Sequence, residues 1–454
     1  MQHCFSSLTY CVRAFGCQMN KHDSERIAGM LEGLGALAVE SYEDADIIIF
    51  MTCCVREAAD VRLMGQVASL KNLAPREGSP LAKRITAVGG CIGQRDGEAL
   101  TETLGNLDVV FGTHNLKSLP HLLYQAIHEG GHQVEVLDSS EDFPTELPST
   151  REHNWAAWLP IMVGCNNFCS YCIVPFVRGR EKSRSLEDIV DEARSYVAEG
   201  VKEITLLGQN VNSYGRDIYG EPRFGDVLRA IDETGIERLR FATSHPKDIT
   251  EEVSEAFGSL RSLMPAIHLP LQSGSNRILK AMNRRYSVEH YLEIVNKLRK
   301  ACPDIALSTD IIVGFPGETE EDFEETYRIV KEVGYTQVFT FLYSKREGTP
   351  AAKLIDDTPQ DVIQSRFERL VALVQEKAFE QNQRDKDTVV EVLVEGTSKR
   401  NEAILSGRSP KNQTVHFPCP EGSSKDELVG RLVRVRIDTA KTWYLSGTML
   451  DKGK

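Results

Sequence analysis

The stretch Gly164-Cys165-Asn166-Asn167-Phe168-Cys169-Ser170-Tyr171-Cys172 places three cysteines on one short loop, with three and then two residues between them. Cysteine thiolates hold iron-sulfur clusters, and this spacing brings three sulfurs to one cluster. A structural zinc site is the alternative, but it needs a fourth Cys or His, and the nearest candidate, His153, precedes the loop across two tryptophans. The spacing favours an iron-sulfur centre. We call its ligands the loop trio: Cys165, Cys169 and Cys172.

Three thiolates leave one iron of a 4Fe-4S cluster without a protein ligand. An open iron that chelates S-adenosylmethionine (SAM) is the starting point of radical chemistry. The spacing of the loop trio, with the aromatic Tyr171 just before the last cysteine, resembles the signature of the radical SAM enzymes. The loop therefore predicts the catalytic centre of the chain.

The length and composition of the chain indicate its domain number, compartment and class of partner. A chain of 454 residues with 41% hydrophobic content predicts about three globular domains. Its eleven cysteines are thinly spread and the N-terminus lacks a cationic start followed by an apolar core, so we expect a cytoplasmic protein. No apolar run is long enough to cross a bilayer. The net charge of -13 argues against general adhesion to nucleic acid but allows a local basic patch.

Residues 8–126 alternate buried apolar runs with stretches of helical period. The predicted strands are 8–15, 46–52, 84–88 and 107–111, and the predicted helices are 23–34, 56–73 and 116–128. This alternation predicts an N-terminal α/β domain with a doubly wound parallel sheet.

One cysteine follows each of the first three predicted strands: Cys17, Cys53 and Cys91. The carboxyl edge of a parallel sheet is where ligands bind, so these three side chains are expected to converge. Buried structural thiols are the competing interpretation, because cysteine packs well as a small apolar residue. The residues alone leave the two interpretations open.

A polar, turn-rich passage at 127–150 predicts a linker, with Ser140, Glu141, Asp142 and Pro144 among its residues. From 151 to 382 the alternation returns, with predicted strands at 159–163, 203–207, 239–242, 267–271, 305–313 and 337–343. Ser185 and Thr319 are predicted helix caps, each three residues before an acid. Six strand–helix units in a row predict a partial (β/α)6 barrel.

Polar residues follow or lie within these strands, at the end where such barrels place their chemistry. We expect them to bind the methionine and ribose of SAM together with Tyr171. The predicted cofactor-binding set is Tyr171, Gln209, Asn210, Ser244, Gln272 and Asp310. His245, which precedes a proline, is better explained as part of an ordinary turn.

Residues 385–450 carry short strand candidates at 389–394, 403–406, 415–417, 432–437 and 443–447, which predict a small all-β barrel. From Arg384 onward, 13 Lys and Arg stand against 10 Asp and Glu, a net charge of +3. These cations are able to follow a phosphate backbone, and a solvated surface is the competing interpretation. They include Lys399, Arg400, Arg408, Lys411, Arg431, Arg434 and Arg436.

Motifs along nearly the whole chain resemble those of the radical SAM methylthiotransferases, in the branch that modifies tRNA. The matching stretches are the three N-terminal cysteine motifs, 165–181, 207–214 and 269–274. The resemblance implies an N-terminal methylthiotransferase domain, a radical SAM core and a C-terminal barrel similar to TRAM, an RNA-binding domain. It also implies that Cys17, Cys53 and Cys91 hold an auxiliary 4Fe-4S cluster.

The chain departs from that family pattern at two places beside these cysteines. Met51 stands where an Asn is usual, and Ala14 where a Thr is common. We expect both to change hydrogen bonding around the auxiliary cluster without removing a ligand. Cys54 is placed to compete for iron, and the sequence assigns no role to Cys4, Cys11, Cys302 and Cys419.

By resemblance, one SAM methylates a sulfur carried by the auxiliary cluster. A second SAM gives the 5′-deoxyadenosyl radical that removes hydrogen from C2 of an adenine. The implied partner is the anticodon loop of tRNA with N6-isopentenyladenosine at position 37; the electron and sulfur donors stay unknown. The alternatives are threonylcarbamoyladenosine tRNA, a ribosomal protein, or an electron-transfer or RNA-binding protein that merely carries clusters. SAM cleavage by the reduced protein separates this last class from the enzymes.

Overall fold

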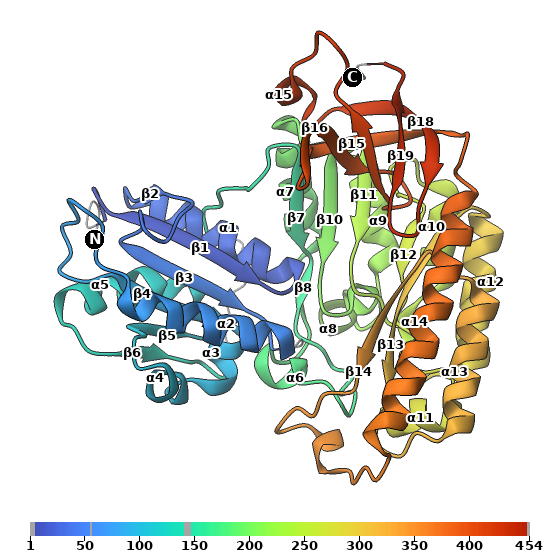
Figure 1. Ribbon diagram of the computed structural model, residues 1–454, viewed down its shortest axis with the longest axis horizontal. Helices are drawn as coiled ribbons and strands as arrows, with labels where there is room; N and C mark the ends of the chain where they lie inside the picture. The colour runs from blue at the N-terminus through green and yellow to red at the C-terminus, as the bar shows by residue number, and fades with distance from the viewer. Residues whose placement is uncertain (1–4, 55–56, 140–146, 452–454) are drawn as a thin grey trace. The chain divides into compact units, whose positions relative to one another are not determined.

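The computed structural model describes residues 5–54, 57–139 and 147–451 and is drawn in Figure 1. The chain forms two compact units. Unit 1 comprises Met1–Glu152, Val163–Asn166 and Cys172–Lys182, and unit 2 comprises His153–Met162, Asn167–Tyr171 and Ser183–Lys454. The cysteine loop is therefore shared, with Cys165 and Cys172 in unit 1 and Cys169 in unit 2.

Unit 1 is built on a parallel sheet in the order β2-β1-β3-β4-β5-β6 (Figure 1). The four predicted strands are confirmed as β1 (Thr9–Phe15), β3 (Ile47–Thr52), β4 (Ile85–Gly90) and β5 (Val109–Phe111). Two short strands, β2 (Leu37–Ala38) and β6 (Gln133–Glu135), extend the edges. The sequence missed them because two or three residues carry too little periodicity to be recognised.

Helices cover both faces of this sheet, as a doubly wound fold requires. They are α1 (Gln18–Gly33), α2 (Glu57–Ser69), α3 (Cys91–Asp96), α4 (Ala99–Leu104) and α5 (Leu119–His128). Alternate residues of β3 enter different cores: Ile47 and Ile49 pack with α1 and α5, while Ile48 and Phe50 pack with α2, α3 and α4. The predicted doubly wound domain is confirmed.

The predicted linker at 127–150 contains β6, which pairs with β5. Its residues Ser140, Glu141, Asp142 and Pro144, like Cys4 and Arg56, lie outside the described part of the chain.

Unit 2 contains the six predicted parallel strands in two sheets, β11-β10-β7 and β12-β13-β14. Their bounds are β7 (Ala156–Pro160), β10 (Glu203–Leu207), β11 (Arg238–Phe241), β12 (Ala266–His268), β13 (Ala306–Val313) and β14 (Gln337–Leu342). β7 ends at Pro160 and β12 ends before Pro270, so both are shifted from the predicted ranges. Proline has no N–H to donate to the next strand, which limits pairing at both places.

The main helices of unit 2 cover the outer face of these strands (Figure 1). They are α7 (Leu186–Ala198), α9 (Phe224–Asp232), α10 (Glu251–Ser259), α12 (Val288–Ala301), α13 (Glu320–Val333) and α14 (Gln360–Gln383). The predicted caps are confirmed, since the side chains of Ser185 and Thr319 accept from the N–H groups of Asp188 and Asp322. The outer face of β13 packs on the helices, and its inner face carries Ser308, Asp310 and Ile312.

The short helices of both units are α6 (Val174–Val177), α8 (Arg216–Tyr219), α11 (Asn276–Ala281) and α15 (Lys425–Leu428). Two short strands, β8 (Met162–Val163) and β9 (Lys182–Ser183), lie where the chain passes from one unit to the other. No helix in the described residues is long and apolar enough to span a membrane.

The C-terminal strands of unit 2 close into a barrel in the order β15-β16-β17-β19-β18. The bounds are β15 (Val389–Ser398), β16 (Asn401–Arg408), β17 (Thr414–Pro418), β18 (Leu432–Ala440) and β19 (Leu445–Met449). Along β18 the buried Val433, Val435 and Ile437 alternate with exposed Arg434 and Arg436, the pattern of a strand with one face in a core. The predicted five-stranded barrel is confirmed.

A buried arginine fixes this barrel to the strands of the same unit. Arg238 on β11 is fully buried and donates to the carbonyl oxygens of Arg408 and Glu391, both at 2.9 Å. Arg240 likewise donates to Ser409 O at 2.8 Å and Pro410 O at 2.9 Å. Charged hydrogen bonds of this kind are among the stronger ones in proteins, so the barrel and the core pack as one unit.

Candidate functional site

The structure brings the three N-terminal cysteines together at the carboxyl edge of the unit 1 sheet. Cys17 caps α1 just after β1, Cys53 follows β3, and Cys91 begins α3 after β4. Cys17 and Cys53 are joined by a thiol hydrogen bond, as are Cys54 and Cys91, and Cys17 interacts electrostatically with Cys91. We call these four residues the unit 1 cysteine cluster: Cys17, Cys53, Cys54 and Cys91.

These contacts favour thiolates at two of the four positions. The hydrogen bond from Cys53 lowers the pKa of Cys17 to about 6 against the opposing effect of burial, and the charge of Arg178 acts in the same direction. The hydrogen bond from Cys54 similarly lowers the pKa of Cys91 to about 7. A thiolate is the form of cysteine that binds a metal. In the described residues no group of three or more Cys, His, Asp or Glu side chains is arranged as a metal-ion site.

A glycine makes the close approach of β1 and β3 possible at this edge. Gly16 has φ of +138°, and a Cβ atom there would lie 2.2 Å from the Cβ of Cys53. Any side chain at this position would push Cys17 and Cys53 apart. The motif Gly16-Cys17 is therefore a steric requirement for the unit 1 cysteine cluster.

Arg178 is the cation of this cluster and comes from the segment that follows the loop trio. Its side chain is buried, and its Nη2 lies 2.9 Å from Asn20 Oδ1 and 3.2 Å from Asp23 Oδ2. It also hydrogen-bonds to Cys91. Burial alone would lower the pKa of Arg178, but the neighbouring Cys91, Asp23 and Cys17 raise it, so the guanidinium stays charged.

The two departures from the family pattern lie in different surroundings. Met51 is buried in the apolar core beneath the sheet, and Ala14 is exposed on β1. Thr52, by contrast, donates its hydroxyl to Gly89 O at 2.7 Å and accepts from the N–H of Ile92, one residue after Cys91.

The remaining described cysteines have packing roles. Cys11 packs in the core beside α2 and donates to Glu40 O, while Cys302 and Cys419 pack at the edges of two other apolar cores.

The loop trio lies on an irregular loop between β8 and α6. In unit 1, the N–H of Cys165 donates to Gly179 O at 3.1 Å, and Gly164, at φ of +75°, leaves no room for a Cβ, which would lie 1.9 Å from Arg180 O. In unit 2, Cys169 is buried and its Sγ accepts from Arg284 Nη1 at 3.6 Å. The backbone of Gly179 therefore holds the start of the loop, and the side chain of Arg284 holds its middle cysteine.

The end of α11 supports the middle of this loop within unit 2. The N–H of Ser170 donates to Met282 O at 2.9 Å, and Asn283 Nδ2 donates to Phe168 O at 2.8 Å. Phe168 adopts a left-handed backbone with φ of 48°. Arg284 is buried, donates to Pro270 O at 2.7 Å and stacks over Tyr286. Sequence reasoning missed Arg284, since nothing local separates it from the exposed Arg285 beside it.

Three of the predicted cofactor-binding residues present buried polar atoms without a hydrogen-bond partner: Gln209 Oε1, Asn210 Oδ1 and Ser244 Oγ. They follow β10 and β11, at the carboxyl ends of these strands. Buried polar atoms are normally paired, so an unpaired group of this kind is what a polar ligand would complete. The donor and acceptor set fits the ribose hydroxyls and amino acid portion of SAM.

The other three predicted residues are more fully engaged. Gln272 has φ of 72° and bridges to β13, donating its N–H to Asp310 O at 2.8 Å. The Asp310 side chain lies on the inner face of β13, with Oδ2 at 3.3 Å from His268 Nε2. Tyr171, like Ile312 and Tyr343, packs against the small apolar core of Ile278, Met282, Phe315 and Ala351. His268 on β12, which the sequence did not single out, thus lies beside Asp310 on the inner face of the β12-β13-β14 sheet.

His245 is confirmed as a turn residue. Its Nδ1 accepts from the N–H of Lys247 at 3.3 Å and caps the short turn Pro246–Asp248, and burial lowers its pKa.

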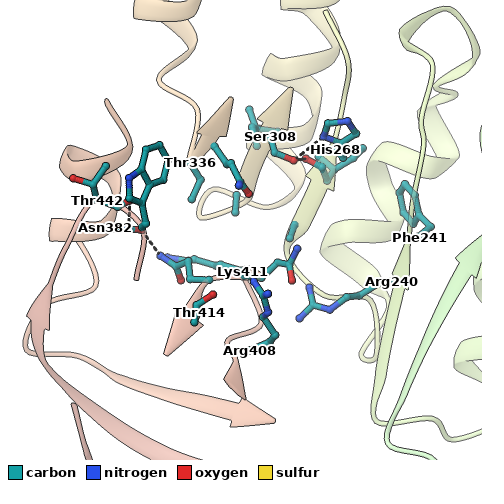
Figure 2. Close-up of a pocket in the computed structure, with 18 residues that line it drawn as sticks. Arg240, Phe241, His268, Ser308, Thr336, Asn382, Arg408, Lys411, Thr414 and Thr442 are labelled. Carbon is teal, nitrogen blue, oxygen red and sulfur yellow. Dashed lines mark hydrogen bonds between the residues drawn. The ribbon is translucent and has the colours of Figure 1, made fainter. Parts of the chain in front are cut away.

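A polar cavity of about 150 Å³ lies in unit 2, between the core strands that carry His268 and Ser308 and the C-terminal barrel (Figure 2). Its cations already have partners: Arg240 binds Glu203, Arg408 binds Glu395, and Lys411 binds Asp304 and Asp385. These interactions satisfy the charges of the cavity internally. The cavity lies at the junction where Arg240 donates to the backbone of the barrel.

Known proteins match nearly the whole length of this chain. It is 46% identical over 448 residues to a tRNA-2-methylthio-N(6)-dimethylallyladenosine synthase of Thermoanaerobacter sp. strain X514, covering 98% of this chain and 93% of that protein. It is 49% identical over 443 residues to the protein of the same name from Streptomyces viridosporus, covering 96% and 86%. The chain belongs to this synthase family. The predicted family resemblance is confirmed.

Three family models match successive parts of the chain. Residues 9–112 match the uncharacterized protein family UPF0004, residues 159–330 the radical SAM superfamily, and residues 383–450 the TRAM domain. Membership of the radical SAM superfamily implies a 4Fe-4S cluster and SAM, and the TRAM domain and family name imply a tRNA substrate.

Among solved structures, the radical SAM methyltransferase TsrM of Kitasatospora setae superimposes with a TM-score of 0.54 at 16% identity, covering 76% of this chain and 74% of that one. At this identity the likeness concerns the fold alone.

Proposed function

We propose that this chain inserts a methylthio group at C2 of N6-isopentenyladenosine at position 37 of tRNA, in the anticodon loop. The observation that carries the proposal is the full-length likeness, at 46–49% identity, to synthases named for this product. The geometry supports it, because the structure holds two separate cysteine sets, as a reaction that needs both a radical and a sulfur source requires.

The loop trio Cys165, Cys169 and Cys172 is proposed to hold the SAM-cleaving cluster. That cluster, when bound, supplies the electron that releases a 5′-deoxyadenosyl radical from SAM. Gln209, Asn210 and Ser244 would bind SAM through their unpaired buried atoms. We assign Gln272, which follows β12, Asp310 on β13 and Tyr171 on the loop itself to the same SAM site.

Cys17, Cys53 and Cys91 are proposed to hold the second 4Fe-4S cluster, whose part in the reaction is to carry the sulfur. The lowered pKa values of Cys17 and Cys91 and the adjacent Arg178 fit the net negative charge of a thiolate-bound cluster. Cys54 donates to Cys91 rather than pointing elsewhere, so we assign it a supporting role.

The inner face of β14 offers an apolar surface for the isopentenyl group. Val338 packs toward the helices, so Phe339, Phe341 and Tyr343 lie on the opposite face, where Phe339 contacts His268 and Tyr343 contacts Phe315. Burying an isopentenyl chain contributes roughly 25 cal/mol per Å² of apolar area. A threonylcarbamoyl group would bring a carboxylate to the same aromatic surface, which is costly without a cation.

The exposed cations of the C-terminal barrel are proposed to contact the RNA backbone. Arg408 and Lys411 are held by acids in the junction, which leaves Lys399, Arg400 and Arg431 as exposed candidates. Arg434 and Arg436 are also exposed, but each pairs with an aspartate. Phosphate groups would compete with these surface ion pairs, which contribute little by themselves.

The test offers the reduced protein three anticodon stem-loops, carrying isopentenyladenosine, threonylcarbamoyladenosine or unmodified adenosine at position 37. Nucleosides are then analysed by mass spectrometry. We expect the methylthio product from the isopentenyl RNA alone, and less of it from a Phe339→Ala variant, with the exposed Phe379→Ala on α14 as the matched control. Product from the threonylcarbamoyl RNA alone would contradict the proposed substrate while leaving the family assignment intact.

A further inference from the structure

The segment after the loop trio is an integral part of unit 1. Residues Cys172–Lys182 belong to this unit, and α6 packs Ile173 and Val177 into the apolar core that also contains Cys54 and Cys91. The carbonyl of Val177 accepts a hydrogen bond from Thr113 Oγ1 at 2.5 Å. The position of the next residue, Arg178, is thus fixed by packing on both sides of the sheet edge.

Arg178 presents its guanidinium to both halves of the unit 1 cysteine cluster. It hydrogen-bonds to Cys91 and interacts electrostatically with Cys17, which lie after different strands. Asn20 and Asp23, on the first turns of α1, hold the other side of the guanidinium. Asp23 also lies 3.5 Å from His22 Nδ1, so its carboxylate is shared between His22 and Arg178.

A second buried arginine of unit 1 shows what a purely structural role looks like. Arg26 lies one turn further along α1 and is also buried, but it donates to His22 Nε2 at 3.3 Å and to the carbonyl of Leu147. Arg26 ties the helix to a distant loop. Arg178 instead faces groups that are able to carry negative charge.

We infer that Arg178 is a positioning residue for the second cluster, a fixed positive charge that raises the reduction potential of iron and sulfur bound by Cys17, Cys53 and Cys91. The inference rests on the proposed assignment of these ligands. A cluster gains negative charge when it is reduced, and a cation held in a poorly hydrated site stabilises that charge. The cation is supplied by Cys172–Lys182, the segment that begins with the last cysteine of the loop trio.

The test uses the full chain with Cys165, Cys169 and Cys172 replaced by alanine, so that only the second cluster contributes a signal. Its midpoint potential is measured by electron paramagnetic resonance during a redox titration. We expect Arg178→Gln to shift the potential negative, with at least a tenfold lower reduced-to-oxidised ratio, which is about 59 mV for a one-electron couple. Arg178→Lys should shift it less, and Arg26→Gln should leave it unchanged.

Asp23→Asn provides a variant of opposite sign. Removing the acid that partly neutralises Arg178 should shift the potential positive. If Arg178→Gln binds no cluster, the potential of Asp23→Asn decides the test. A positive shift in Asp23→Asn supports the inference, and an unchanged potential overturns it. Lower thermal stability of Arg178→Gln with an unchanged potential would also overturn it, because that is the result for an arginine that only pairs with Asp23.

The failure of the ligand assignment is distinguishable from the failure of this inference. If the chain with Cys165, Cys169 and Cys172 replaced by alanine binds no iron after reconstitution, the second cluster does not exist and Arg178 has no role toward it. If the same triple-alanine chain binds about four irons and its potential does not change in the Arg178 and Asp23 variants, the proposed function stands and only this inference is rejected.

Discussion

The two cysteine sets of this protein are built in opposite ways. The loop trio occupies eight consecutive residues, so its members are close for covalent reasons before any folding takes place. Cys17, Cys53 and Cys91 are separated by 36 and 38 residues and meet only because three parallel strands end at one edge. A site of the first kind is readable as a motif. A site of the second kind becomes visible only once the sheet order is known.

The two sets nevertheless share one physical feature, a buried arginine next to a thiol. Arg178 hydrogen-bonds to Cys91 in unit 1, and Arg284 donates to Cys169 in unit 2. Arginine keeps its charge when buried and offers several donors, which suits it to a site that holds negative charge. The comparison teaches that each cysteine set includes one cysteine that contacts a buried arginine of the same unit.

The largest expected effect comes from removing each set of ligands. Alanine at Cys165, Cys169 and Cys172 should abolish SAM cleavage and leave about four irons in the protein. Alanine at Cys17, Cys53 and Cys91 should retain SAM cleavage yet give no methylthio product. Iron analysis and 5′-deoxyadenosine assays check both. A folded variant of either kind that lost all its iron would break the picture of two independent sets.

Two glycines offer a more local test of the same comparison. Gly164→Ala would place a Cβ 1.9 Å from Arg180 O, and Gly16→Ala would place one 2.2 Å from the Cβ of Cys53. We expect each to cost at least about 1–3 kcal/mol of backbone strain and to reduce iron at its own cysteine set only.

The control is Gly33→Ala at the end of α1, where an added Cβ meets nothing within 4 Å. Chemical denaturation and iron content of the three variants are compared. Full iron in both Gly16→Ala and Gly164→Ala would show that neither cysteine set depends on the tight backbone contact seen beside it.

The smallest effect concerns Arg284. Replacing it with Gln removes charged hydrogen bonds to Cys169 and Pro270, which should cost about 1.5–3 kcal/mol of stability. It should also slow SAM cleavage severalfold while leaving the iron bound by unit 1 unaltered. The exposed neighbour Arg285→Gln is the matched control. Equal urea midpoints and equal SAM cleavage rates for the two variants would show that Arg284 does not support the loop trio.

Sequence patterns predicted the elements of the fold well where they are long. The fully buried β3 and β4 are continuous apolar runs, and Ser185 and Thr319 cap their helices as their spacing predicts. The patterns failed for β2 and β6, which have three residues or fewer, and for the bounds of β7 and β12, where a proline interrupts pairing. Short elements form because a neighbouring strand edge is available, and that information lies elsewhere in the chain.

In the candidate site, too, the local features were predictable from the sequence and the long-range ones were not. By itself the sequence determined the loop trio, the polar residues after the strands and the family, because ligand spacing and strand ends are local features. Only the tertiary structure decided that Cys54 pairs with Cys91, that Met51 faces the apolar core, and that Arg178 and Arg284 are buried cations beside thiols while Arg285 is exposed. The physical reason is that burial and electrostatic partners depend on which distant segments pack together, and no local pattern of residues encodes that choice.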